Sequence, residues 1–140
     1  MLTVEAGGDR LGLTVSGLIG LSLEPPLVGV SVSRQAAMHE LLRDAGGFAL
    51  SLLAGDQEAV AQHFARGVPP FAHWHGIATL EHIEGAPLIA DALGWLRCRT
   101  GAAHPVGDHT LFVGEVVAAE VGRDATSLVH LGQAYTSVGG

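Results

Sequence analysis

Short segments in which apolar and polar residues alternate recur along this chain, and this pattern constrains the fold more than any other feature. Residues 27–33, LVGVSVS, alternate without interruption and predict a β-strand. Residues 2–6 and 11–17 alternate as well, and the GGDR sequence between them favours a β-hairpin. The same pattern predicts further strands over residues 48–54, 76–83, 93–103, 109–121 and 127–131.

Helical periodicity occurs in only two segments, residues 36–47 and 56–66. In the first, two glycines supply a C-terminal stop, and four apolar residues share one face: Met38, Leu41, Leu42 and Ala45. Many short strands and two short peripheral helices favour a mainly β fold built as a closed or partly closed barrel. Strands and helices alternate at the front of the chain, which would also suit a βαβ unit. The later two-thirds, however, hold too little helix for a doubly wound sheet.

Composition limits the class of protein and its partners. With 140 residues and no linker or repeat, we expect one domain over residues 1–140. The net charge is −7 and no basic cluster occurs, which argues against a nucleic-acid partner. The apolar runs are shorter than the roughly 20 residues that a membrane-spanning helix needs, so we expect no membrane partner.

Cellular location and assembly follow from two further features. The first ten residues lack the pattern of a secretion signal, and Cys98 is the single cysteine, so a reducing cytoplasm is the expected compartment. Apolar residues make up 48% of the chain, which is more than the core of one copy needs. We therefore expect a homo-oligomer that buries part of this surface.

The stretch from Gly12 to Val32 carries the strongest functional signal. Thr14, Ser16 and Ser22 alternate with apolar residues, and glycines beside them leave the main chain accessible. A flat polar heterocycle binds well to such a surface, because the backbone offers donors and acceptors without bulky side chains. Read from the residues alone, the stretch fits a glycine-rich hairpin with solvated hydroxyls better than a ligand-binding surface.

Six segments of the chain occur in the order and spacing of a known family: GLTVSG, SLEPPLVGVSV, FALSLLAGDQEAVAQHFA, GAPLI, ALGWLRCR and GDHTLFVGEV. From Gly12 to Tyr135 the chain resembles the flavin reductase family of FMN-binding split β-barrels. The resemblance implies a Greek-key split barrel of about six strands, in a homodimer that binds flavin near the subunit interface. It implies an NAD(P)H-dependent flavin oxidoreductase that uses FMN, or FAD in its place. Such proteins supply reduced flavin to a partner monooxygenase or use bound flavin directly.

The resemblance also implies the roles of individual residues. The isoalloxazine ring would lie along Thr14, Val15, Ser16 and Gly17. Ser22 and Leu23 would lie nearby. The flavin phosphate would be held by Ser33, Arg34 and Gln35, with His39 near the same end. His109 would lie beside the flavin where the nicotinamide binds, and Tyr135 matches a family tyrosine that follows a glycine. From the residues alone, Arg34 fits a solvated arginine at the end of a strand equally well. Asp108 and His109 could instead cap the turn.

Departures from the family pattern keep two alternatives open. Where the family has paired serines and a phenylalanine, residues 17–20 read Gly-Leu-Ile-Gly, and the chain starts inside the expected first strand, without an N-terminal helix. Both features favour a non-catalytic flavin-binding protein of the same fold. In the segment FAHWHGIATLEH, His73 and His75 resemble the first metal-binding box of a cupin barrel, so a small metal-dependent barrel is the third hypothesis. We interpret the remaining histidines as surface or helix-face residues, and Cys98 as an inert core thiol.

Overall fold

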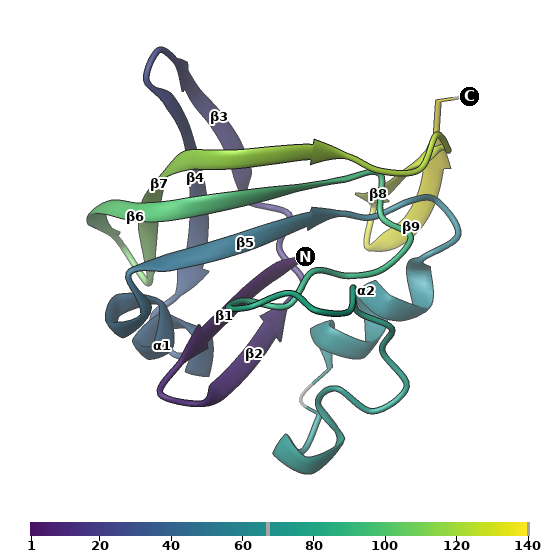
Figure 1. The fold of residues 1–140 in the computed structure, drawn as a ribbon, viewed down its shortest axis with the longest axis horizontal. Coiled ribbons are helices and arrows are strands. Elements are labelled where there is room, and N and C mark those ends of the chain that lie inside the picture. The colour runs from purple at the N-terminus through teal and green to yellow at the C-terminus, as the bar shows by residue number, and fades with distance from the viewer. Residues whose placement is uncertain (67, 140) are drawn as a thin grey trace.

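A computed structural model describes residues 1–66 and 68–139, and within them an antiparallel sheet of seven strands forms the body of the molecule (Figure 1). Gly67, which begins the loop expected before His73, and Gly140 lie outside the described residues. The strand order in the sheet is β2-β1-β5-β6-β7-β4-β3. The strands are β1 (Leu2–Ala6), β2 (Asp9–Leu13), β3 (Leu18–Leu23), β4 (Pro26–Ser33), β5 (Gly47–Leu52), β6 (Gly94–Val106) and β7 (His109–Val121).

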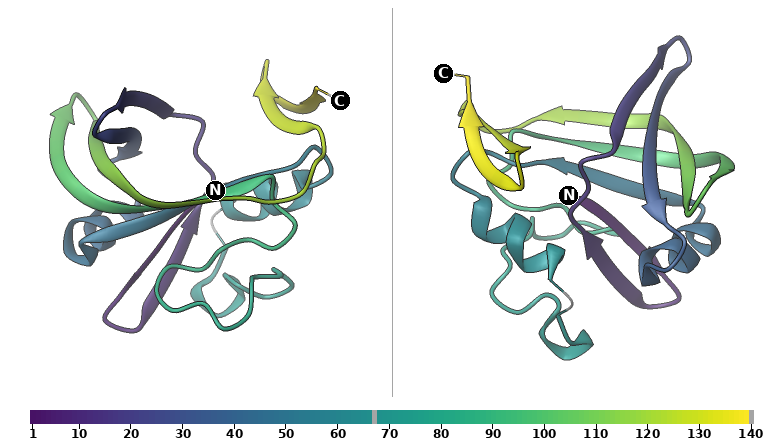
Figure 2. Two further views of the ribbon diagram at one scale, coloured as in Figure 1. Left: turned by 45° about the horizontal axis from the view of Figure 1, so that its top comes forward. Right: turned by 180° about the vertical axis from the view of Figure 1, so that it is seen from behind.

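Curvature converts this sheet into a split barrel, which confirms the predicted fold class. The long strands β6 and β7 carry register shifts at Arg97/Cys98 and Thr100/Ala103, and such bulges bend a sheet. Figure 2 shows the β3–β4 hairpin rising on one side of the bent sheet and the β1–β2 hairpin lying on the other. Helix α1 (Ala37–Ala45) packs against β1, β2, β4 and β5.

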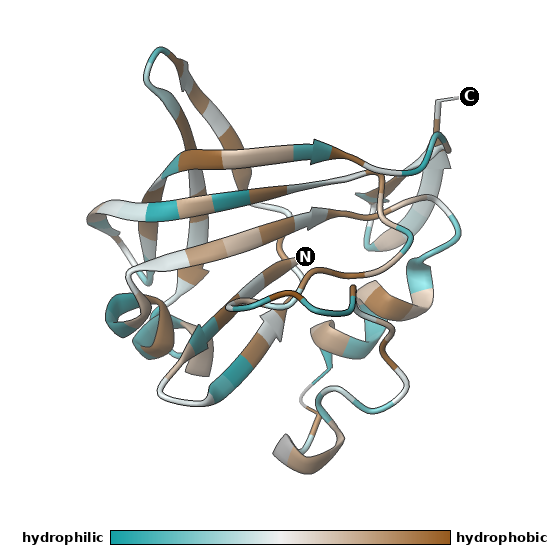
Figure 3. Cartoon of the chain, in the orientation of Figure 1, coloured by the Kyte–Doolittle hydropathy of each residue, from teal (hydrophilic) through white to brown (hydrophobic). Residues whose placement is uncertain are grey.

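The core forms where alternating strands meet the apolar face of α1. Val30 and Val32 of β4 are buried, whereas Ser31 and Ser33 point to the opposite face, as the period of two requires. Met38 and Leu42 bury the predicted face of α1, and Gly46 ends the helix with a φ of 69°. Figure 3 shows this alternation as brown and pale bands along the strands. One buried cluster results: Leu2, Val4, Val30, Val32, Met38, Leu42, Phe48, Leu50, Cys98 and Phe112.

Three further elements surround the barrel. Helix α2 (Glu58–Ala65) buries Phe64 beside Ile89, and the single 3₁₀ turn η1 (Pro70–Ala72) follows it. Near the C-terminus, β8 (Ser127–Leu131) and β9 (Ala134–Val138) pair in a separate two-stranded sheet. No helix within residues 1–66 and 68–139 combines the length and the apolar character that crossing a membrane requires.

The structure corrects several sequence-based expectations. The described residues contain nine strands, seven of them in the main sheet, and alternation predicted neither β3 nor β9 among them. Residues 76–83, predicted as a strand, form a loop with one isolated bridge between Thr79 and Ile89. Cys98 is buried as expected, and burial raises the pKa of its thiol to about 11, which keeps it inert.

Candidate functional site

The outer face of β4 and β7, opposite the core, carries the first part of the candidate site. In the antiparallel register Ser33 lies opposite His109, and Ser31 lies opposite Leu111. Paired residues point to the same side of a sheet, so both serine hydroxyls and the imidazole share this face. A surface of small hydroxylated residues beside an imidazole can receive a planar polar ligand.

Gly17 brings bare main chain against this face. Its carbonyl accepts a hydrogen bond from the Ser31 amide at 3.2 Å. A Cβ placed on Gly17 would lie 3.3 Å from the Ser31 Cβ, which is a tight approach. The departure from the family's paired serines therefore removes a hydroxyl and lets the main chain of Gly17 lie close against Ser31.

The turn after β4 forms the cationic end of the same face. The Arg34 amide donates to the Asp108 carbonyl at 2.9 Å, and the Arg34 Nη1 donates to the Gly107 carbonyl at 3.3 Å. The Gln35 amide donates to the Ser33 Oγ at 3.3 Å. These bonds tie the turn to the β6–β7 turn. Helix α1 begins directly after it without a side-chain cap, so its first amides face the region of Arg34.

His109 is oriented by the residue before it. The His109 Nδ1 donates to the Asp108 Oδ1 at 2.7 Å, and the imidazole remains 43% exposed. This hydrogen bond from His109, reinforced by the charge of the ring, lowers the pKa of the Asp108 carboxyl. Because Asp108 engages Nδ1, Nε2 is the ring atom that a ligand on the outer face would meet.

His39 lies on α1 behind this end, and its side chain is buried rather than exposed at the surface. Its side chain is buried, with Nε2 2.7 Å from the Thr110 Oγ1 and Nδ1 3.4 Å from the Glu40 Oε1. The ring also meets Phe112 edge-on at a centroid distance of 5.4 Å. Its polar partner lies on β7, 71 residues further along the chain, so local periodicity gave no sign of the burial.

A cavity of about 630 Å³ adjoins the segment between β2 and β3. Thr14, Val15 and Ser16 form one side of it, residues 50–53 at the end of β5 line it, and the β8–β9 hairpin forms the opposite wall. The Thr14 hydroxyl donates to the Ala61 carbonyl of α2 at 2.6 Å, which anchors this segment. The hairpin contributes Ser127, Leu128, Val129, His130 and Tyr135.

The structure thus gathers the predicted residues into two neighbouring groups joined through Gly17. The first group is the cationic end with Ser33, Arg34, Gln35 and His109; the second lines the cavity and comprises Thr14, Val15, Ser16 and Tyr135. Ser22 and Leu23 join neither group, because they pair with Leu27 and Pro26 at the opposite end of β4 from Ser33.

Two site residues escaped the sequence analysis. Ser31 sits between the groups, and the clean alternation of LVGVSVS could have revealed it, since it shares a face with Ser33. His130 lines the cavity next to Tyr135, at a ring-centroid distance of 5.0 Å. The pairing of β8 with β9 places these two rings together across a tight turn at Gly132 and Gln133, and the glycine directly after the predicted strand 127–131 could have indicated this hairpin.

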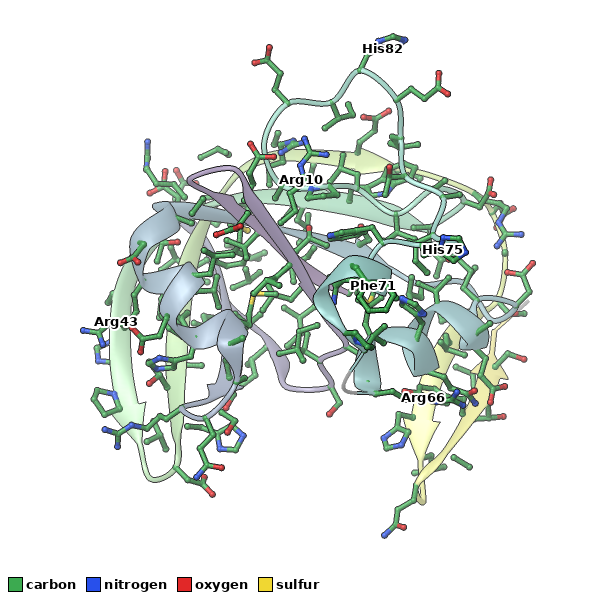
Figure 4. All side chains as sticks on the ribbon, turned by 90° about the horizontal axis from the view of Figure 1, so that it is seen from below. Arg10, Arg43, Arg66, Phe71, His75 and His82 are labelled. Carbon is green, nitrogen blue, oxygen red and sulfur yellow. The ribbon has the colours of Figure 1, made fainter. Side chains whose placement is uncertain are left out.

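The histidine segment expected to resemble a metal box has a structural role. The His73 Nε2 accepts a hydrogen bond from the Gly12 amide at 2.9 Å, and His75 is exposed. Figure 4 shows His75 and His82 well separated along the connection between η1 and β6. Across residues 1–66 and 68–139, no three histidine, cysteine or acidic side chains converge as a metal site would require.

Comparison with known proteins agrees with this geometry. At the level of sequence, the chain is 42% identical over 135 residues to the reductase component of 4-hydroxyphenylacetate 3-monooxygenase from Thermus thermophilus, covering 96% of this chain and 84% of that protein. It is 35% identical over 137 residues to an FMN reductase (NADH) from Agrobacterium fabrum, covering 96% of this chain and 75% of the relative.

Solved structures give the same result at the level of the fold. The NADH:FAD oxidoreductase SgcE6 from Streptomyces globisporus, in complex with NAD and FAD fragments, superimposes with a TM-score of 0.91 at 32% identity, over 99% of this chain and 82% of that one. The family model described as flavin reductase like domain matches residues 1–139. This chain therefore belongs to the flavin reductase-like domain family.

Proposed function

We propose that this chain is a single-domain, NADH-dependent flavin oxidoreductase that uses FMN, with FAD as the other candidate flavin. The observation that carries the proposal is the juxtaposition of Arg34, His109 and the Ser31–Ser33 face beside the bare Gly17 backbone. The relatives named above are reductases that act with NADH, FMN or FAD. Their names favour catalysis over the alternative of non-catalytic flavin binding.

The residues present fit a flavin mononucleotide. The isoalloxazine ring would lie along Thr14–Gly17, where Gly17 lies close to Ser31 and no side chain projects between them. The phosphate would meet Arg34 and the uncapped first amides of α1, because a forked cation and a helix N-terminus both favour an anion. Ser33 and Gln35 would complete this end, with His39 and Thr110 supporting it from behind.

When bound, the flavin supplies the hydride chemistry, and the chain supplies binding and orientation. Asp108 holds the His109 ring through Nδ1, so that Nε2 orients the nicotinamide on the outer face. Apolar side chains of the cavity, among them Val15, Leu18 and Leu50, keep water from the reacting rings. Holding two planar rings in contact accounts for much of such a rate enhancement.

The assembly we propose is a homodimer that passes reduced flavin to a monooxygenase. Ser22 and Leu23 lie far from the rest of the site within one chain, and a second copy would bring them to the neighbouring flavin. The relative from Thermus thermophilus is a reductase component of a monooxygenase, which supports a partner of this kind. A cytoplasmic location stays a prediction from the sequence.

The test combines an absorption spectrum with steady-state kinetics. Purified protein mixed with FMN should show bound flavin bands, and NADH oxidation should depend on the added flavin. His109→Ala should lower kcat/KM for NADH about tenfold or more, because the nicotinamide loses its orienting group. His82→Ala is the matched control, since His82 is 94% exposed on a distant loop. Full activity in His109→Ala would remove His109 from the mechanism.

A further inference from the structure

The β8–β9 hairpin stands apart from the main sheet yet forms a wall of the cavity. Its two strands pair with each other but not with any strand of the seven-stranded sheet (Figure 1). Figure 2 shows it rising on the same side of the sheet as the β3–β4 hairpin. Five of its residues line the cavity, including the adjacent rings of His130 and Tyr135. The width of the cavity therefore depends on what holds this hairpin in place.

Few backbone contacts attach the hairpin. The Gly55 amide donates to the Thr126 carbonyl at 2.7 Å, and the Leu128 amide donates to the Leu53 carbonyl at 3.1 Å. An isolated bridge joins Ala54 to Ser127. Gly55 permits this close docking, because a Cβ there would lie 2.6 Å from the Ser137 Cβ. Two hydrogen bonds and one bridge are a weak attachment for an element that shapes a binding site.

Arg123 adds side-chain bonds to this attachment. The main chain just before the hairpin is also held, because the Gly122 amide donates to the Leu93 carbonyl at 2.8 Å and the Arg123 amide donates to the Ala92 carbonyl at 3.0 Å. Arg123 lies between β7 and β8, and its guanidinium forms a bidentate ion pair with Asp56, just before α2. The Nη1–Oδ2 distance is 2.8 Å and the Nη2–Oδ1 distance is 2.5 Å. The Arg123 Nε donates to the Asp91 carbonyl at 3.1 Å. A guanidinium that makes three hydrogen bonds holds its segment better than a typical surface ion pair does.

The ligand that this wall contacts follows from the layout of the site. Thr14, Val15 and Ser16 of the proposed ring segment line the same cavity as the hairpin, whereas Arg34 and His109 are not among its lining residues. Since His109 orients the nicotinamide in the proposed function, the volume bounded by His130 and Tyr135 is left for the rest of NADH, whose adenine is also a planar ring. Aromatic walls suit a planar ring, since offset stacking and edge contacts stabilise it.

We propose that Arg123 is a positioning residue that, together with Asp56, fixes the β8–β9 hairpin and thereby sets the affinity for NADH. The inference rests on the proposed function. It assigns Arg123 no contact with substrate or flavin; the residue acts through the wall that carries His130 and Tyr135.

Arg123→Gln and Asp56→Asn test the kinetic part. Each should raise KM for NADH about threefold or more with kcat changed less than about twofold, because the chemistry is untouched while the wall is displaced. Arg123→Lys keeps the charge without the fork and should fall between Gln and wild type. Arg10→Gln is the matched control, because it breaks the exposed Arg10–Glu5 ion pair of 2.6 Å on the β1–β2 hairpin. An unchanged KM for NADH in both Arg123→Gln and Asp56→Asn would overturn the proposal.

A double mutant separates positioning from a general loss of stability. If Arg123 acts through the wall, then His130→Ala combined with Arg123→Gln should raise KM for NADH no further than the stronger single change. Independent, additive effects of the two substitutions would overturn the proposal.

Hydrogen exchange gives a readout that does not depend on activity. The Gly55 and Leu128 amides, whose acceptors join the hairpin to the body, should exchange faster in Arg123→Gln and Asp56→Asn but not in Arg10→Gln. Unchanged exchange would overturn the proposal even in an active reductase. Conversely, if exchange became faster in the variants but the wild-type protein did not oxidise NADH, the proposed function would be wrong, whereas the attachment of the hairpin by Arg123 would stand.

Discussion

Arg34 is the residue whose role can be separated most cleanly from its neighbours. Its guanidinium is the cation at the end of the Ser31–Ser33 face, next to the uncapped start of α1. We expect Arg34→Gln to weaken FMN binding about tenfold, because a charge-assisted contact to phosphate is lost. Riboflavin lacks the phosphate, so its dissociation constant should change little. Fluorescence titration with FMN and with riboflavin measures the two dissociation constants, and Arg43→Gln is the control. If Arg34→Gln weakened the binding of FMN and of riboflavin equally, Arg34 would not be the residue that contacts the phosphate.

For single residues, the sequence predicts the burial of a side chain where one strand or one helix turn determines it. Cys98 was predicted as an inert core thiol, and the structure confirms its burial and its raised pKa. The strand predicted over residues 27–33 ends at Ser33 as expected, so Arg34 follows it directly, and the role of both residues towards the flavin phosphate stays a prediction. His39 shows the limit: its partner Thr110 lies on β7, 71 residues further along the chain, and no local pattern encodes that contact.

Among the elements, the boundaries that glycines and strict alternation mark were predictable. Helix α1 with its Gly46 stop and β7 over residues 109–121 match the sequence-based expectation, and the β1–β2 hairpin occurs where it was expected, although β2 covers Asp9–Leu13 rather than residues 11–17. Residues 76–83 were mistaken for a strand because they carry enough apolar residues to pack. Leu80 and Ile83 do pack, but against Ala86 and Leu88 in a small satellite cluster, and the backbone stays outside the sheet. Apolar content alone therefore does not distinguish a covering loop from a strand.

The loop after α2 is held to β2 by a bond that protonation should break. Burial, with the charge of the nearby His63, lowers the pKa of His73 below the ordinary 6.5, and neutral Nε2 accepts the Gly12 amide. The folded state thus binds fewer protons, so stability is present above that ordinary pKa and falls as pH drops through it towards the folded value. His73→Gln keeps an acceptor but cannot titrate. Its urea midpoint should fall less than that of wild type between about pH 7 and pH 5.

The control for that comparison is His82→Gln, because His82 is exposed and bonds no backbone amide of β2 in the described residues. This variant should retain the full wild-type dependence on pH. If His73→Gln and wild type lose stability in parallel, the His73–Gly12 bond does not carry the pH response of this loop.

For the whole molecule, the order and spacing of the six family-like segments predicted the fold better than any one segment did. The barrel was predictable because the resemblance spans nearly the whole chain, and the family model indeed matches residues 1–139. The cavity was not predictable, since it lies between Thr14–Ser16 and a hairpin more than 100 residues later. Site volumes of this kind arise only from the relative placement of elements, which the bend of β6 and β7 determines here.

The surface of one copy carries a final prediction. Ile19, Leu21 and Leu23 of β3 are 48%, 44% and 96% exposed, an arrangement that favours burial against a second copy. We expect light scattering to give twice the mass of one chain, and Leu23→Glu to shift this value towards the single chain, because a charge would enter the interface. Phe71→Glu is the control, since Phe71 is 90% exposed on η1, away from β3.

Leu23→Glu should also weaken FMN binding, because a single copy cannot bring Ser22 and Leu23 to the flavin. A wild-type protein that stays monomeric at high concentration would contradict both expectations.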